Sequence, residues 1–500
     1  MPQDAKRRPT SERRRVLVGT SWTMTSTILG VIVGVVSRPL LVAFVGIGGY
    51  GVWASAIAVA SMFSLGGDLG VASALPKIIA ERRGQRKDEG TIPSSGLLFA
   101  LFTGAIAGAA LLLSSPFIGQ RIAFADFPLL LQIQSLQMPL NFGIGSLLAL
   151  LQGGRSFRAY SLSTILLATA NLFFMTVLLF LGAGLVGVMV ASLLSTSILF
   201  AILVVSCRKW LPLPSFRDLR ADLTQLVPVG LQLTVSIFLS RIMYQVDVVI
   251  LSFWTVDPTV VGSYSLAVFV ARVLWILPGS IGLTTYPVVS EYFVRQDSRR
   301  LSAYLRTALT ASCAMTGVLA AGIVLLGRPV LRIAFGPAAL PAYELCLLLL
   351  AGTAALGILR SVAPAILGAG RPAVAVRISA LGAILTSILC LVITPIAGST
   401  GTAVAVSISF LCVSVALVWA TDRHVLPREG RSQFYRKLGP VAAGAIMFSL
   451  VAIPVAAPES GSWAFVVAGL IWGVGSAVLL IASGGRSILR WVMKSSDRPR

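Results

Sequence analysis

The chain has 500 residues, of which 56% are hydrophobic and only 12% charged, and its mean hydropathy is +0.90. Soluble domains carry about twice this charged fraction, so the composition excludes an ordinary soluble protein. The net charge of +22 would suggest a nucleic-acid partner if the cations formed a soluble patch, but they are distributed between apolar segments.

Apolar runs recur along almost the whole chain, and each is long enough to cross a bilayer, which takes about 20 helical residues. An open sheet would leave backbone groups unsatisfied in lipid. We therefore predict an all-α polytopic membrane protein with about 14 transmembrane helices. The predicted spans are residues 16–38, 50–78, 95–118, 128–151, 158–181, 184–206, 225–253, 260–288, 304–327, 339–368, 373–394, 399–420, 438–457 and 462–483. The first span resembles a signal peptide, but its length and the lack of a small-residue cleavage site before Arg38 favour a retained helix.

The cations lie almost entirely on one side of these spans. If the N-terminus is cytoplasmic, the tails and the even-numbered loops hold 32 of the 40 Lys and Arg residues. The opposite side holds three, Arg121, Arg328 and Arg332. This asymmetry follows the positive-inside rule for an even number of helices, so we predict that both termini are cytoplasmic. Attraction of the cations to anionic lipid headgroups would be a secondary consequence.

Three landmarks suggest that the chain contains two copies of a six-helix unit. The stretches that begin at Gly51 and Gly262, and the later prolines Pro76 and Pro287, are both separated by 211 residues. A Gly-Arg pair recurs at an offset of 216 residues. We therefore predict an N-terminal lobe at 1–206 (spans 1–6), a cytoplasmic linker at 207–224, a C-terminal lobe at 225–420 (spans 7–12), and an appended helix pair with a cytoplasmic tail at 421–500.

The sequence offers little to support an enzyme or a metal site. No loop between spans exceeds about 20 residues, so the loops have no room for a folded soluble domain. The five cysteines have no paired spacing, and His424 is the only histidine. A membrane glycosyltransferase or acyltransferase would need acidic metal ligands or a catalytic histidine. We therefore expect no cofactor, no metal and no enzymatic activity.

Several charged residues fall at membrane depth, where each costs about 2.5–3.5 kcal/mol to insert and so tends to face a bundle interior or a wet cavity. They are Arg38, Asp68, Lys77, Arg241, Asp247, Arg272 and Arg360, with Glu344 near an outer end. Because five are cations and two are central carboxylates, a cavity that they lined would be net positive. Alternatives remain, since Lys77 can extend to an interface and Asp247 can form a structural ion pair with a residue of another helix.

Three aromatic residues lie deep enough to stack on sugar rings, although aromatic residues at span ends are usually interfacial anchors. Asp68 is too short to reach an interface, and its glycine-rich surroundings, "GGDLG", permit close packing and a local helix break. We predict that the substrate-binding residues are Arg38, Lys77, Arg241, Arg272, Arg360, Trp53, Tyr264 and Trp275, and that the ion-coupling residues are Asp68 and Asp247.

With these residues in place, the chain resembles the Wzx-type polysaccharide flippases, which export O-antigen or exopolysaccharide units. Their superfamily also holds multidrug and toxic-compound extruders and lipid II flippases. The resemblance rests on "RPLLVAFVGIGGYGVWASAIAVASMFSLGGDLGVASALPKIIAERRG" (38–84), "YQVDVVILSFWTVDPTVVGSYSLAVFVARVLWILPGSIGLTTYPVVSEYF" (244–293) and "ILGAGRP" (366–372). Each motif is degenerate and hydrophobic, so together they identify the superfamily better than the substrate.

The resemblance implies two six-helix lobes around a central cavity that opens alternately to each side of the bacterial inner membrane. The implied cargo is an undecaprenyl-pyrophosphate-linked oligosaccharide, with a polysaccharide polymerase and glycosyltransferases as partners. Arg38, Asp68 and Asp247 match positions of the family pattern. Arg272 and Arg360 match none, so their predicted role rests on depth and charge alone.

Two other functions of the superfamily remain alternatives. A lipid II flippase also carries an anionic lipid pyrophosphate, so the charge inventory suits it equally. A cation-coupled multidrug exporter should have a net acidic cavity, and five cations against two carboxylates argue against it.

Overall fold

A computed structural model describes residues 8–64, 70–85, 90–154 and 156–426, and all regular secondary structure within these ranges is helical. In the same ranges, nine helical stretches are long and apolar enough to cross a membrane. The predicted all-helical membrane architecture is therefore confirmed. Asp68 and the predicted spans 438–457 and 462–483 lie outside the described residues.

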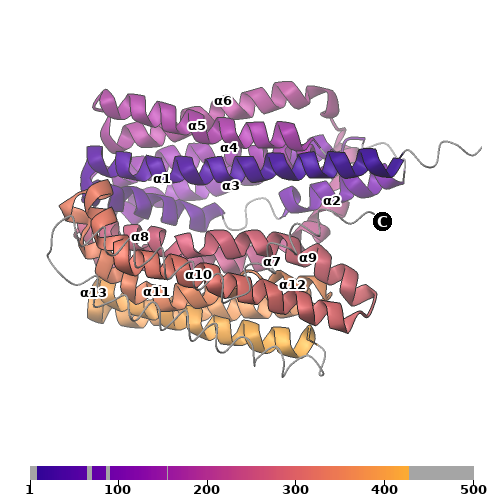
Figure 1. Cartoon of the computed structure of the whole chain (residues 1–500). Helices are drawn as coiled ribbons and strands as arrows, with labels where there is room; N and C mark the ends of the chain where they lie inside the picture. Colours follow the sequence, from indigo (N-terminus) through magenta and orange to yellow (C-terminus); the bar gives the residue numbers. More distant parts are fainter. Residues whose placement is uncertain (1–7, 65–69, 86–89, 155, 427–500) are drawn as a thin grey trace, which may run out of the picture. The chain divides into compact units, whose positions relative to one another are not determined.

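The chain divides into two compact units, Met1–Arg241 and Ile242–Arg500. The first unit contains the following helices (Figure 1): α1 (Arg8–Phe63), α2 (Val71–Gly84), α3 (Ile92–Arg121), α4 (Phe127–Gly153), α5 (Phe157–Phe180), α6 (Gly184–Cys207), the short 3₁₀ helix η3 (Arg208–Trp210) and the beginning of α7 (Phe216–Trp254). Helix α4 packs between α3 and α6, and α6 also packs on α5. The core of this unit is formed by buried aliphatic residues of α2, α3, α4 and α6, together with Leu226 of α7.

Hydropathy predicted an interval between spans where Gly46 lies, but not the break inside the second predicted span. The predicted spans 16–38 and 50–78 meet within α1, where Gly46 has φ 73° and ψ 175°, a conformation that favours glycine. The second predicted span is itself divided, because α1 ends at Phe63 and α2 begins at Val71. Gly70, at φ 79°, precedes α2, and a Cβ at this position would overlap the backbone of Gly230 in α7. The glycine therefore permits close approach of α2 and α7.

The second unit begins with the end of α7. Its other elements are α8 (Pro258–Arg272), the 3₁₀ turn η4 (Val273–Trp275), α9 (Ile276–Val294), α10 (Ser298–Phe335), the 3₁₀ turn η5 (Pro337–Ala339), α11 (Pro341–Leu359), α12 (Pro364–Gly368) and α13 (Pro372–His424). Helix α11 packs against both α8 and α13. Gly398, at φ 56°, divides α13 between the predicted spans 373–394 and 399–420.

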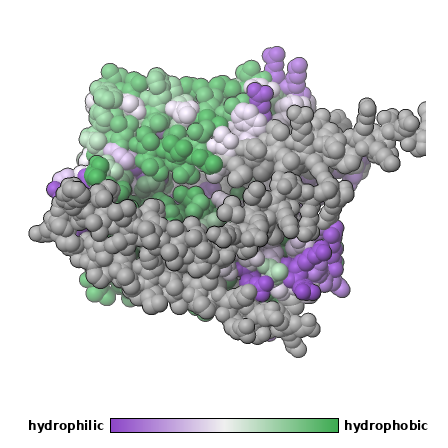
Figure 2. All heavy atoms as spheres, in the orientation of Figure 1, coloured by the Kyte–Doolittle hydropathy of each residue, from purple (hydrophilic) through white to green (hydrophobic). Residues whose placement is uncertain are grey.

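The outer surface of the helices is apolar, as a lipid-facing surface must be. On α5 and the turn that follows it, Phe173, Phe180 and Leu181 are 62%, 71% and 74% exposed. Figure 2 shows hydrophobic residues covering the visible face of α5 and α6, with hydrophilic residues gathered toward the ends of the helices. This distribution is typical of helices that cross a bilayer.

The boundary between the two units falls at Arg241, inside α7, and not in a loop. Residues 225–241 accordingly pack with the first unit, through Leu226 among others. The predicted division into two six-helix lobes with an appended helix pair stays a prediction.

Candidate functional site

Two predicted arginines of the second unit converge on the same pair of aromatic rings. The guanidinium carbon of Arg272 lies 5.4 Å from the ring centroid of Trp275 and 5.9 Å from that of Tyr244. The guanidinium carbon of Arg360 lies 4.9 Å and 5.9 Å from the same two centroids. These separations are those of cation–π contacts, which stabilise a cation in a partly desolvated place.

The local backbone explains why these residues meet. Arg272 ends α8, and the 3₁₀ turn η4 brings Trp275 onto the same side, because residues three apart are eclipsed in a 3₁₀ helix. Arg360 directly follows the end of α11, which packs on α8. Gly357, one turn earlier, faces Trp275, and a Cβ there would lie 2.9 Å from the indole Cδ1. The glycine leaves room for the indole ring.

Hydrogen bonds hold the cluster together with neutral acceptors. Arg272 donates to the carbonyl oxygen of Tyr244, and Arg360 donates through Nη1 to the hydroxyl oxygen of Tyr244 over 3.3 Å. The Nε of Arg360 is buried and has no hydrogen-bond partner within the described ranges. Phe410 completes the group, with its ring centroid 6.1 Å from Tyr244 and 5.8 Å from Trp275. We call Tyr244, Arg272, Trp275, Arg360 and Phe410 the arginine–aromatic cluster.

A buried carboxylate lies next to this cluster. Asp247 follows Tyr244 by three residues on α7 and is 1% exposed. The hydroxyl of Tyr264, which is fully buried on α8, donates to its Oδ2 over 2.7 Å. Its Oδ1 has no hydrogen-bond partner among the residues that the structure describes. Arg272 interacts with this carboxylate through its charge. The alternative expected from the sequence was an ion pair between Asp247 and a residue of another helix; the hydrogen-bond partner in the structure is instead the neutral hydroxyl of Tyr264 on α8.

The remaining predicted site residues that the structure describes lie in the first unit. Arg38, on α1, is half-buried and donates through Nη1 to the carbonyl oxygen of Gly34 over 2.8 Å. Trp53, also on α1, lies with its ring centroid 5.5 Å from that of Tyr50. Their binding roles stay predictions.

Lys77 and Arg241 are more exposed. The side chain of Lys77 is 59% exposed and its Nζ lies 3.9 Å from Glu81 Oε1, one turn further along α2. An exposed pair of this kind contributes at most about 1 kcal/mol, so it leaves the ammonium group free to exchange partners. Arg241 is exposed on α7.

Two members of the cluster were not predicted from the sequence. Tyr244 could have been found, because it precedes Asp247 by three residues and so lies on the same helical face. Phe410 comes from α13, and no local spacing connects it to the other members.

Comparison with known proteins places the chain in a family. The family model for "Polysaccharide biosynthesis protein" matches residues 16–293, which is more than half of the chain. Comparison with curated protein sequences finds no match.

Solved structures of membrane transporters resemble the chain in fold. The lipid II flippase MurJ in an inward closed conformation superposes with a TM-score of 0.70 at 17% identity, covering 95% of this chain and 100% of that chain. An inward-facing MATE family multidrug resistance transporter superposes with a TM-score of 0.61 at 15% identity, covering 79% and 98%. The MATE transporter VcmN of Vibrio cholerae gives a TM-score of 0.58 at 13% identity, covering 82% and 97%. The chain therefore belongs to the polysaccharide biosynthesis protein family, and its fold is similar to that of MurJ and of the MATE transporters.

Proposed function

We propose that this protein is a flippase that moves an undecaprenyl-pyrophosphate-linked oligosaccharide or polysaccharide repeat unit from the cytoplasmic to the periplasmic leaflet. The family and the fold are those of membrane flippases and transporters. The observation that carries the choice of cargo is the arginine–aromatic cluster, which places two guanidinium groups and two indole or phenol rings together within membrane-spanning helices.

The chemistry of the cluster suits an anionic lipid headgroup joined to a sugar. A guanidinium group presents several donors in a planar fork that matches phosphate oxygens. Arg272 and Arg360 contact aromatic rings and donate to neutral oxygens, and neither lies within ion-pair distance of a carboxylate among the described residues, although Arg272 also attracts Asp247 through its charge. A pyrophosphate can therefore take up their donors without first displacing a carboxylate. The indole N–H of Trp275 donates to the Thr353 carbonyl over 2.9 Å, which leaves the ring face for a sugar.

The other predicted residues extend this proposal. Arg38, Lys77 and Arg241 would add positive charge along the route of the headgroup, and Trp53 would offer a second aromatic surface to sugar. Tyr264 is fully buried with its hydroxyl committed to Asp247, so we assign it to the carboxylate and not to the sugar.

Asp247 is the residue that we propose to couple transport to a proton or sodium gradient. A buried carboxylate that is only partly hydrogen-bonded is costly, and binding of a proton or a cation relieves that cost. Asp68 is proposed for the same role from its sequence position alone. The test is transport by the Asp247→Asn and Asp68→Asn variants, singly and together, with and without an imposed gradient. Loss of gradient dependence supports the proposal, and unchanged dependence in the double variant contradicts it.

The cargo is tested by replacing the arginines of the cluster. The variants Arg272→Ala and Arg360→Ala should reduce surface glycan about tenfold or more, with undecaprenyl-linked intermediates accumulating, because each removes a charge-assisted contact to phosphate worth about 1.5–3 kcal/mol. Arg328→Ala, an exposed arginine at the far end of α10, is the matched control. Membrane levels of all variants must be equal. Unchanged export from both cluster variants would remove this choice of cargo.

A lipid II flippase is the second candidate, because MurJ has a similar fold over nearly the whole chain. Proteoliposomes that contain the purified protein and either lipid II or a lipid-linked oligosaccharide distinguish the two cargoes. The two arginines of the cluster disfavour a multidrug exporter, because its cationic substrates would be repelled by them. If the protein were such an exporter, it would extrude cationic dyes. Alternating access, the inner-membrane location with both termini cytoplasmic, and the partnership with a polymerase and glycosyltransferases are parts of the same proposal.

A further inference from the structure

A short basic segment connects two membrane spans and carries a helix with two different faces. We call residues 208–228 the interfacial segment. One candidate span ends at Trp210 and the next begins at Thr234, so the segment lies where the chain leaves one span and enters another. It comprises the 3₁₀ helix η3 (Arg208–Trp210) and the first turns of α7.

One face of this helix is fixed to the first unit. The carboxylate of Asp222, which is 6% exposed, accepts hydrogen bonds of 2.7 Å from both Thr91 Oγ1 and Ser95 Oγ, at the beginning of α3. A carboxylate is favourable at that place, because the N-terminus of a helix carries partial positive charge. Leu226, one turn later, is fully buried in the core of the unit. The orientation of the helix about its axis is therefore set by these contacts.

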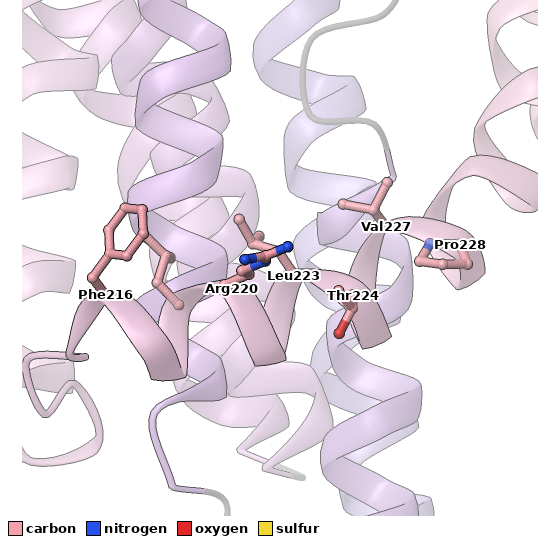
Figure 3. Close-up of a pocket in the computed structure, with 7 residues that line it drawn as sticks. Phe216, Arg220, Leu223, Thr224, Val227 and Pro228 are labelled. Carbon is pink, nitrogen blue, oxygen red and sulfur yellow. The ribbon is translucent and has the colours of Figure 1, made fainter.

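The adjoining face is apolar and borders an open groove. Phe216, Leu219, Leu223 and Val227 recur at helical spacing and line a groove of about 550 Å³ together with Arg220, Thr224 and Pro228 (Figure 3). Phe216 is 84% exposed, and Leu213, just before the helix, is 91% exposed. Figure 3 shows Arg220 between Phe216 and Leu223 on this face. Apolar side chains of this size need a covering.

The charge of the segment indicates what kind of molecule covers the groove. Four cations are exposed, namely Arg208, Lys209, Arg217 and Arg220. Of the two acidic residues of the segment, Asp222 is hydrogen-bonded to the beginning of α3. Only Asp218 is exposed, and it accepts a hydrogen bond from Ser215. An amphipathic helix with cations beside its apolar face is the pattern of segments that lie in the headgroup region of anionic membranes.

We propose that the interfacial segment binds an anionic phospholipid of the surrounding bilayer, with an acyl chain along the groove and the phosphate on Arg217 and Arg220. Arginine stems can pack along apolar surface while the guanidinium reaches a phosphate, which suits Arg220 at the wall of the groove. This site is separate from the arginine–aromatic cluster and does not depend on the proposed cargo.

The test uses the full chain in nanodiscs made either of phosphatidylcholine alone or with phosphatidylglycerol. Thr224→Cys, at an exposed position that lines the groove, carries a polarity-sensitive fluorophore in a Cys412→Ser background, because Cys412 is exposed and the other four cysteines are buried. Quenching is measured with spin-labelled phosphatidylglycerol and with spin-labelled phosphatidylcholine. We expect both lipids to quench the fluorophore, and phosphatidylglycerol to do so more strongly.

Variants of the arginines then decide whether charge recognises the lipid. Each of Arg217→Gln and Arg220→Gln should lower the ratio of the two quenching constants by up to about fivefold, the effect expected for one cation at an anionic surface. Arg121→Gln is the control. This exposed arginine ends α3, about 30 residues along the chain from Thr91, which contacts Asp222, so the substitution should leave the ratio unchanged. Equal quenching by both lipids in the labelled protein with all its arginines intact would overturn the proposal. So would a fluorophore that neither lipid quenches, which would mean that water or another part of the chain, such as residues 427–500, occupies the groove.

Discussion

Removal of one hydroxyl group should reveal how strongly the buried carboxylate depends on its partner. In Tyr264→Phe, Asp247 Oδ2 loses a 2.7 Å hydrogen bond, and Oδ1 already has no partner among the described residues. A hydrogen bond to a charged group contributes about 1.5–3 kcal/mol, and a buried charged oxygen left unpaired adds to the cost. We expect the free energy of unfolding to fall by about 3 kcal/mol, which is roughly a hundredfold in the equilibrium constant.

A double-mutant cycle isolates this interaction from the packing of the ring. In an Asp247→Leu background the hydroxyl has no carboxylate to bind, and replacing both partners with apolar groups is nearly neutral. Tyr264→Phe should therefore cost little or even stabilise there, so the two substitutions should be non-additive by about 3 kcal/mol. Tyr343→Phe is the control, because its hydroxyl donates to the neutral carbonyl of Val324 over 2.7 Å. It should cost about 1 kcal/mol and add simply to Asp247→Leu.

The assay is unfolding of the purified protein by SDS in mixed micelles, followed by circular dichroism. Additivity of Tyr264→Phe and Asp247→Leu within about 0.5 kcal/mol would refute the reasoning, because it would mean that the hydroxyl and the carboxylate do not stabilise each other.

Two further predictions concern backbone positions of the second unit. A Cβ at Gly282 of α9 would overlap the carbonyl oxygen of Arg360, so Gly282→Ala should displace that arginine and reduce both thermal stability and glycan export. Gly279→Ala is the control, because it has open space around it on the same helix and should change neither property. Equal behaviour of the two variants would contradict this prediction. Asp257 caps α8 by accepting bonds from the Thr259 backbone N–H at 2.8 Å and its hydroxyl at 2.7 Å, and these bonds lower the pKa of Asp257 below its usual value. The cap should therefore add about 1 kcal/mol to the free energy of unfolding above about pH 4, and this contribution should disappear as the pH falls through the lowered pKa of Asp257. The melting temperatures of Asp257→Ala and of the parent protein should therefore converge in acid. A constant difference between them down to about pH 2 would contradict this prediction.

Hydropathy predicted the positions of long apolar helices well, because the apolar length needed to cross a bilayer can be read from the sequence alone. The predicted spans 95–118 and 158–181 correspond closely to α3 and α5. The breaks inside long apolar runs depend on backbone conformation, which hydropathy does not report. Gly46 and Gly398 lie in the intervals between predicted spans, but nothing in the residues Val273–Trp275 distinguishes a 3₁₀ turn from a continued helix.

The same contrast applies to the candidate site: the types of its residues could be predicted, but their meeting in space could not. Arg272, Trp275 and Arg360 were identified because charge and large aromatic groups are unusual at membrane depth. Their convergence was not predictable, because it requires the end of α8, the turn and the end of α11 to meet in space. Phe410 illustrates the general limit, since an apolar residue in an apolar helix carries no signal of its neighbours.

The helix that crosses the boundary at Arg241 has a practical consequence for anyone who wishes to express the halves separately. A gene cut at residue 241 would sever a continuous ladder of i to i−4 backbone bonds, and both fragments would carry four unpaired amide or carbonyl groups into lipid. A cut in the non-helical stretch before Phe216 would leave the whole of α7 on the second fragment and take Asp222 away from its serine and threonine donors. Complementation between co-expressed fragments should therefore depend strongly on the cut site. It should succeed only where α7 remains intact and Asp222 can still bind the beginning of α3.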